Sequence, residues 1–146
     1  MIFAIKSLRS MERTAKIIGL ALGMLLAFTG VVRAQGGEYD VFVPISKYIS
    51  QGDGESLSAW FADNLEVSIR QTSNNCSKNQ ARQIVKNFFE TNAPRSFTIS
   101  HTAGKGNKKY AIGSLKTGGE TFLVTLFVSI DGTGYKIQHL KIETMP

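Results

Sequence analysis

His101 and Tyr110 are the two side chains of this sequence whose types are best suited to proton transfer. The imidazole of a histidine titrates near neutral pH and can act as a base, and a tyrosine hydroxyl can donate a hydrogen bond to a developing oxyanion. The Gly-rich segment 104–107 lies between them and predicts a hairpin that brings the two side chains together. We expect His101 to continue the apolar strand face of Phe97 and Ile99, which would place the pair in an internal pocket. The alternative is a histidine that makes a local hydrogen bond or is exposed near a strand end.

Trp60 is a third candidate for a ligand pocket, because an indole ring offers a flat apolar surface. Its neighbour Phe61 is also aromatic, and the simpler interpretation is that both rings pack in the core.

The carboxylates are poorly placed for catalysis inside a sheet. Glu120, Asp131 and Glu143 fall at predicted turns or near the chain end, and Glu66 alternates away from the apolar residues beside it. We therefore assign no catalytic residue. The sequence has only two His and one Cys, and it has neither an HExxH nor a paired CxxC motif. We therefore predict no metal site and expect no cofactor.

Cys76 is the only cysteine, so an intramolecular disulfide is excluded. It precedes Ser77-Lys78-Asn79-Gln80, a capping-box pattern that begins a helix, and we expect its side chain to pack locally. A reactive thiol or an intermolecular bridge is the alternative.

A cationic cluster, GKGNKK, occupies residues 104–109. It lacks the GKS or GKT ending of a phosphate-binding loop, and we interpret it as a solvated hairpin tip. The alternative is a site for an anionic headgroup or a polysaccharide.

The charge of the chain is unevenly distributed. The 146 residues have a net charge of +6, but residues 1–34 hold five basic side chains and one acid. Four of the basic residues precede an apolar run over 17–32. The run ends in Val32-Arg33-Ala34, which is typical of a signal peptide cleaved after Ala34. Translation from Met11 would give a leader of ordinary length, and both starts stay open. We expect an exported protein, periplasmic or secreted.

The alternative for residues 1–34 is a membrane anchor that is not removed. The apolar run is shorter than the roughly 20 residues that a spanning helix needs, so we expect no stable membrane insertion after cleavage. Residues 35–146, with 12 basic and 10 acidic side chains, form one predicted domain. Its near-neutral charge gives no footprint for nucleic acid.

The residue pattern predicts an α+β fold. A helical hairpin spans about 41–64, a strand covers 65–70, and a polar loop leads to a helix that starts at the Ser77 cap and ends before Pro94. Four strands joined by short turns then form an antiparallel meander. Residues 121–130 are apolar on both faces, which predicts a central strand covered on both sides.

This order resembles the nuclear transport factor two-like superfamily, a cone-shaped, cystatin-like fold in which a curved sheet wraps a helix. The segments Cys76–Ala81, Asn87–Phe89, Pro94–Phe97, Ile112–Leu115 and Tyr135–Ile137, with His101, are similar to a family of small exported bacterial proteins known as domain of unknown function 4783. The resemblance implies a fold rather than an activity.

Two functions are consistent with that resemblance. The first is a non-catalytic module that binds a small molecule or a protein through the cone or an exposed sheet face, with a homodimer through the sheet as one arrangement. The alternative is an isomerase or dehydratase, activities found in the superfamily, with a pocket built on His101 and Tyr110. We prefer the first, because the sequence places no carboxylate in the cone.

Removal of the leader can be tested by intact-mass spectrometry of the protein purified from its own host. We expect the mass of residues 35–146. A mass that includes the apolar run 17–32 would contradict cleavage and favour the membrane anchor.

Overall fold

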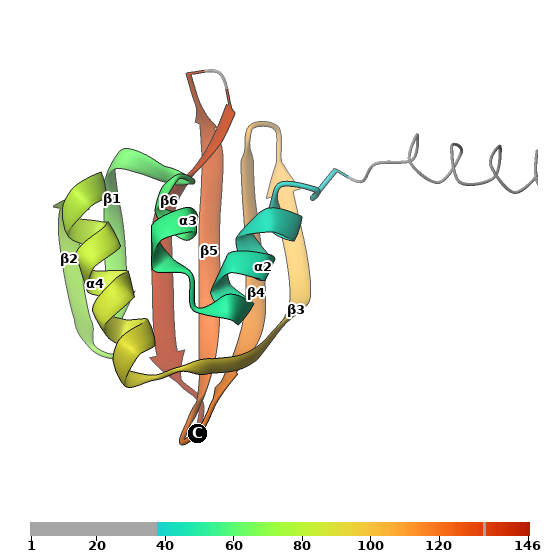
Figure 1. Ribbon diagram of the computed structural model, residues 1–146. Helices are drawn as coiled ribbons and strands as arrows, with labels where there is room; N and C mark the ends of the chain where they lie inside the picture. The colour runs from blue at the N-terminus through green and yellow to red at the C-terminus, as the bar shows by residue number, and fades with distance from the viewer. Residues whose placement is uncertain (1–37, 133) are drawn as a thin grey trace, which may run out of the picture. The chain divides into compact units, whose positions relative to one another are not determined.

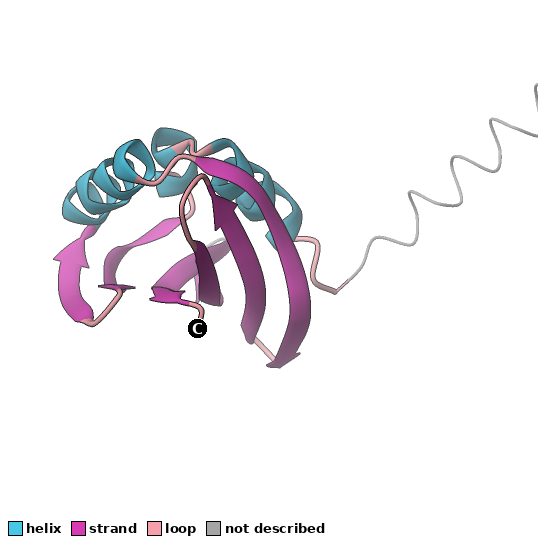
Figure 2. Ribbon diagram, turned by 90° about the horizontal axis from the view of Figure 1, so that it is seen from below, coloured by secondary structure: helices cyan, strands magenta, loops and turns pink. Residues whose placement is uncertain are grey.

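A curved six-stranded sheet with helices on one of its faces organises the part of the chain that the computed structural model describes, residues 38–132 and 134–146 (Figures 1 and 2). The predicted leader lies outside the described residues. Tyr39–Pro146 form one unit by their contacts. None of the helices in these residues is long and apolar enough to cross a membrane.

The elements and the sheet order confirm the predicted α+β class. In chain order they are α2 (Phe42–Gln51), α3 (Gly54–Ser58), β1 (Phe61–Ile69), β2 (Thr72–Ser77), α4 (Lys78–Thr91), β3 (Pro94–Lys105), β4 (Lys108–Thr117), β5 (Thr121–Asp131) and β6 (Gly134–Thr144). The strands are ordered β2-β1-β6-β5-β4-β3, and the predicted meander forms its β6-β5-β4-β3 part. The β1–β6 pair is parallel and joins the first hairpin to the meander.

Local signals set the helix ends. Ser77 and Gln80 form the predicted capping box at the start of α4, with the Gln80 amide N–H donating to the Ser77 hydroxyl and the Ser77 amide N–H to the Gln80 side chain. Asp53 caps α3 by accepting from the Ser56 amide at 3.0 Å. Gly52 ends α2 with a φ of 66°, and a Cβ there would meet Pro94 Cδ at 2.9 Å, so both its backbone angle and its space favour glycine.

Two expectations about the first half of the fold were wrong. The segment predicted as a polar loop contains β2, whose polar residues pair antiparallel with β1 at the edge of the sheet. Phe61, expected on the second helix, begins β1 instead and pairs with Ile137 of β6. A strand with few apolar residues, such as β2, shows no alternation of apolar and polar side chains in its sequence. It becomes a strand because a neighbouring strand pairs with its backbone.

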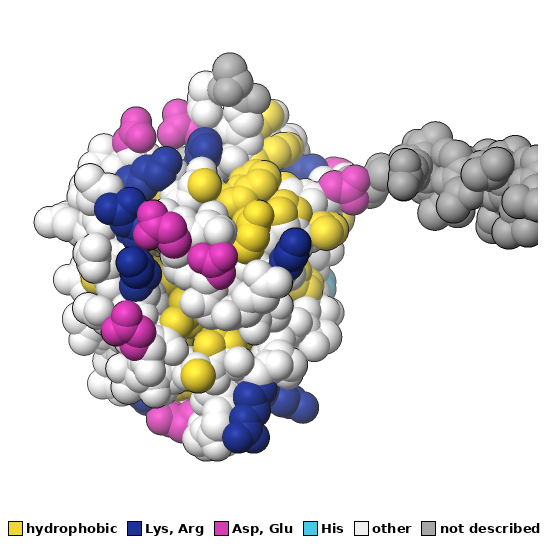
Figure 3. Space-filling view, viewed as in Figure 1, with side chains coloured by type: hydrophobic (Ala, Val, Ile, Leu, Met, Phe, Trp, Pro, Cys, Tyr) yellow, Lys and Arg dark blue, Asp and Glu magenta, His cyan; other side chains and the backbone are white. Residues whose placement is uncertain are grey.

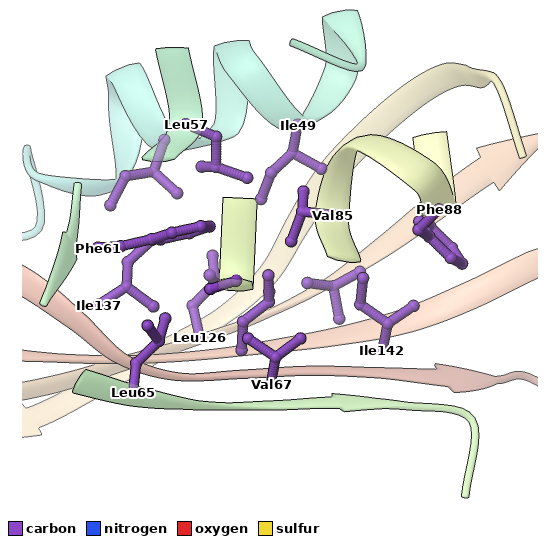
Figure 4. Close-up of a cluster of buried hydrophobic side chains, with 14 of the residues drawn as sticks. Ile49, Leu57, Phe61, Leu65, Val67, Val85, Phe88, Leu126, Ile137 and Ile142 are labelled. Carbon is purple, nitrogen blue, oxygen red and sulfur yellow. The ribbon is translucent and has the colours of Figure 1, made fainter. Parts of the chain in front are cut away.

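Apolar side chains fill the space between the helices and the sheet. Ile49, Leu57 and Val85 come from the helices and meet Val67 and Leu126 of the sheet (Figure 4). The ring of Phe88 on α4 meets that of Phe122 edge to face, with 5.1 Å between centroids. This cluster commits one face of each central strand to the core.

The opposite face of the sheet, here called the outer face, is not covered by any described element. Phe127 of β5 points to it and is 42% exposed. The prediction that residues 121–130 are covered on both sides was therefore wrong for the outer face, although β5 is central as predicted.

Arg70 ties two turns together at one end of the sheet. It adopts a φ of 58° between β1 and β2, and its guanidinium donates to both carboxylate oxygens of Glu120 at 3.0 and 3.1 Å. Its Cζ also lies 5.2 Å from the centre of the Phe122 ring. The helix side shows another charge cluster, over α3 and α4, where Glu55 pairs with Arg82 and Lys86 (Figure 3).

Replacing Phe88 by Ala should lower the free energy of unfolding by about 3–5 kcal/mol, because it opens a cavity against Phe122. Phe127→Ala is the matched control, since this ring is on the outer face, and we expect a loss of about 1 kcal/mol or less. Urea unfolding followed by circular dichroism measures both. Equal losses for the two variants would contradict the packing described for α4.

Candidate functional site

Four rings form a row across the outer face, one from each strand of the meander. His101 on β3, Tyr110 on β4, Phe127 on β5 and His139 on β6 are neighbours in that order, with centroid distances of 5.8, 6.0 and 5.5 Å. The pairing of Tyr110 with Phe127 and of Phe127 with His139 sets the last two contacts. Aromatic cross-strand pairs of this kind stabilise a sheet, and here they also expose a continuous aromatic surface.

A register shift places His101 in this row. Ile99 pairs with Gly113, but His101 pairs with the next residue of β4, Ile112, so Ser100 is an extra residue on β3. The bulge reverses the alternation, and His101 points to the outer face instead of continuing the face of Phe97 and Ile99. The expectation of a shared face was wrong, because a bulge depends on pairing that the sequence of one strand does not reveal.

The structure brings His101 and Tyr110 together, as the hairpin predicted. The Tyr110 hydroxyl oxygen lies 3.4 Å from His101 Nε2 on an exposed part of the surface. Trp60 is not near them in the fold: it lies between α3 and β1, packs against the core, and its carbonyl accepts from the Ile137 amide at 2.7 Å. The three candidate residues therefore do not line one pocket.

A cluster that the sequence analysis did not identify holds His139 at the other end of the row. His139 Nδ1 lies 3.7 Å from a Glu66 carboxylate oxygen, and Nε2 lies 3.2 Å from the Ser68 hydroxyl. The order carboxylate, imidazole, hydroxyl is that of a nucleophilic triad. Ser68, however, is 7% exposed and its hydroxyl also contacts that of Ser73 at 3.1 Å. The cluster fixes the orientation of the His139 ring rather than presenting a nucleophile.

A groove of about 730 Å³ lies on the outer face beside Tyr110 and Phe127, at the end of the sheet where the β3–β4 hairpin turns. The predicted cationic segment 104–109 forms this hairpin, and Lys105 and Lys108 line the groove. Lys108 and Tyr110 are two residues apart on β4, so the sequence already indicated that they share a face. Only the register between β4 and β5 shows that Phe127 lies beside them in the groove.

One lysine of the cationic segment is not solvated as expected. Lys109 is 7% exposed and points to the helix side, where its ammonium lies 5.3 Å from the centre of the Tyr39 ring and 5.2 Å from that of Tyr135. Two aromatic faces stabilise a cation that is partly removed from water. The other buried polar side chains among the described residues are those of Ser58 and Ser68.

Cys76 lies in the core beside β1. Its thiol is within 3.6 Å of the Leu65 carbonyl oxygen, and burial raises the pKa of the thiol above its ordinary value. Within residues 38–132 and 134–146 no group of three or more His, Cys, Asp or Glu side chains is close enough to hold a metal ion.

Comparisons with known proteins identify relatives of the whole unit. Residues 42–143 match the family model described as Domain of unknown function (DUF4783). A DUF4783 family protein from Bacteroides ovatus is 22% identical, with a TM-score of 0.69 over 71% of this chain and 94% of that chain. One from Bacteroides uniformis is 21% identical, with a TM-score of 0.69 over 70% of this chain and 95% of that one.

A more distant structure extends the likeness in fold. An NTF2-like protein of unknown function from Cytophaga hutchinsonii is 9% identical, with a TM-score of 0.54 over 74% of this chain and 89% of that chain. No curated protein matches the sequence of this chain.

Alkylation of Cys76 by iodoacetamide should be at least about tenfold slower in the native protein than in urea, because the thiolate is the reactive form and burial raises the thiol pKa. The pH at which alkylation becomes fast should therefore be higher for the folded chain. Cys76→Ser should leave the solution size unchanged. A wild-type dimer that disappears on adding a reducing agent would contradict this packing role.

Proposed function

Since the chain belongs to the DUF4783 family, whose function is unknown, and has the nuclear transport factor two-like fold that its sequence predicted, we propose a function from its own surfaces. The protein is a non-catalytic module that binds a small molecule or another protein on the outer face of its sheet.

The distribution of aromatic side chains supports this proposal. Inside the fold, Phe88, Phe89 and Phe122 belong to one packed cluster between helices and sheet. On the outer face, the row from His101 to His139 crosses β3, β4, β5 and β6, with His101 and Phe127 exposed and Tyr110 and His139 half-buried. An exposed apolar surface rimmed by polar residues is typical of a binding site.

One further apolar side chain extends this surface along the sheet. Met145, directly after β6, is an exposed large hydrophobic residue like Phe127, and its sulfur lies 3.9 Å from the hydroxyl of Ser114 on the outer side of β4. Such a face suits a flat partner, and a second copy of the chain paired through the sheet is one such partner. A small molecule would instead occupy the groove beside Tyr110 and Phe127.

The alternative is an isomerase or dehydratase, and the 3.4 Å contact between His101 and Tyr110 is the observation that favours it. Proton transfer by such a pair is most effective where the protein excludes water from the substrate. Both side chains lie on an exposed sheet face, and the groove is lined by Tyr110 but not by His101. We therefore prefer binding over catalysis.

The proposal includes export. The basic residues, the apolar run 17–32 and the Val32-Arg33-Ala34 ending support a periplasmic or secreted location for the folded unit. A binding surface presented outside the cytoplasm would meet ligands and partners of that compartment.

Native mass spectrometry of the protein purified from its own host tests the binding role. We expect a retained small molecule or a second copy, and we expect Phe127→Ser to lose it, because this change removes the centre of the aromatic row. Val43→Ser is the control, since Val43 is 68% exposed on α2, which covers the opposite face. An unloaded monomer, or an adduct that survives in the Phe127 variant, would contradict the proposal.

A further inference from the structure

The groove at the hairpin end of the outer face combines an apolar floor with unpaired positive charge. Four strands line it, and its lining includes Lys105, Lys108, Tyr110, Phe127, Ser129 and Gln138. Its volume of about 730 Å³ falls in the range of sites that hold a single small ligand.

The floor of the groove is aromatic. Tyr110 pairs with Phe127 across β4 and β5, and the ring centroids are 6.0 Å apart with an interplanar angle of 36°. Ala103, which pairs with Tyr110 from β3, adds a small side chain and leaves room above the rings. A flat or linear apolar body lying on these rings would remove both from water.

Two lysines stand at one end of this floor. Lys105 and Lys108 pair directly across the β3–β4 hairpin, so their side chains leave the sheet on the same face. Like charges in directly opposed positions repel each other, and neither lysine has an ion pair with any residue that the structure describes. An anion placed between the two ammonium groups would relieve this repulsion.

The hairpin holds the lysines in position. Gly106 supplies the turn with a φ of 62°, and the Ile130 amide of β5 donates to the Asn107 carbonyl at 3.3 Å. Lys108 also pairs with Ser129. Ser129 and Gln138 add neutral polar side chains to the lining, so the described residues that line the groove include cationic and neutral groups but no acid.

We propose that this groove binds one small amphipathic anion, with an acyl chain or fused-ring body on Tyr110 and Phe127 and a carboxylate or phosphate between Lys105 and Lys108. The inference rests on the proposed binding role of the outer face and adds the ligand class. Each lysine acts as a point charge and needs no bidentate geometry, so the headgroup is selected by charge.

The occupant is a single free molecule rather than a bilayer surface. Peripheral attachment to an anionic bilayer calls for a cluster of about four to eight basic residues. The outer face also carries Glu66 and Glu143, and Glu143 pairs with Lys141 at 3.3 Å. Lys116 and Lys141 also lie on this face, but toward the opposite end of the sheet from the groove, and the acids among them dilute the positive charge that a bilayer would meet.

Isothermal titration calorimetry with dodecanoate, below its micelle concentration, tests the inference. We expect dodecanoate to bind at least about tenfold more tightly than dodecyltrimethylammonium, which has the same chain and the opposite charge. The variant with Lys105→Gln and Lys108→Gln should weaken dodecanoate binding about tenfold, since it removes two exposed charge pairs between the protein and the headgroup. It should leave the cation's binding unweakened.

Lys116→Gln is the matched control, because Lys116 is exposed at the far end of the same strand and does not line the groove. We expect this variant to bind dodecanoate like the wild type. Lys105 and Lys108 are both exposed, so an unchanged melting temperature should accompany the loss of binding in the double variant.

The outcomes separate this inference from the proposed function. Equal affinity for the anion and the cation, or equal weakening by Lys116→Gln, would overturn the anion site and leave binding on the outer face intact. Binding to phosphatidylglycerol vesicles without binding to dodecanoate would also overturn it, in favour of a membrane surface. No dodecanoate binding together with an adduct in native mass spectra that Phe127→Ser removes would overturn the ligand class alone.

Discussion

Burial of one face of the sheet against the helices is the constraint on which the rest of the structure depends. Side chains alternate along a strand, so once Phe122, Val124 and Leu126 of β5 enter the core, Phe127 must point outward. The same alternation on β4 points Tyr110 outward beside it. On β6 the extra residue Gln138 lets Ile137 and Leu140 both enter the core while His139 points outward. The aromatic row thus follows from how the core is filled, adjusted by bulges in the outer two of its strands.

A bulge and a tight turn in the β3–β4 hairpin set the positions of further side chains on the outer face. The extra residue Ser100 turns His101 outward, so the row begins one strand earlier than strict alternation allows. The tight turn at Gly106 then aligns Lys105 with Lys108 next to Tyr110. One hairpin therefore supplies a ring pair and a charge pair to the same face, while Lys109, one residue away, is directed between two tyrosines on the helix side.

Apolar side chains fill the interior of the fold, and the polar side chains beside the groove lie on its surface. Between the helices and the sheet, Phe88 and Phe122 meet edge to face in a packed cluster. The polar groups able to recognise a ligand lie outside, around Tyr110 and Phe127. A surface groove favours reversible binding. A ligand bound there stays partly in contact with water, and it can enter and leave without a conformational change of the protein.

Signals that act within a few residues could be predicted from the sequence: the Ser77 capping box, the Gly52 helix end and the turns of the meander depend on neighbouring residues alone. The contact between His101 and Tyr110 was predictable for the same reason, since a short hairpin joins them. The strand nature of β2, the outward turn of His101 and the separation of Trp60 from both were decided by tertiary structure. Each of these depends on which strand pairs with which, and in what register, and backbone pairing between distant segments leaves no local pattern to read.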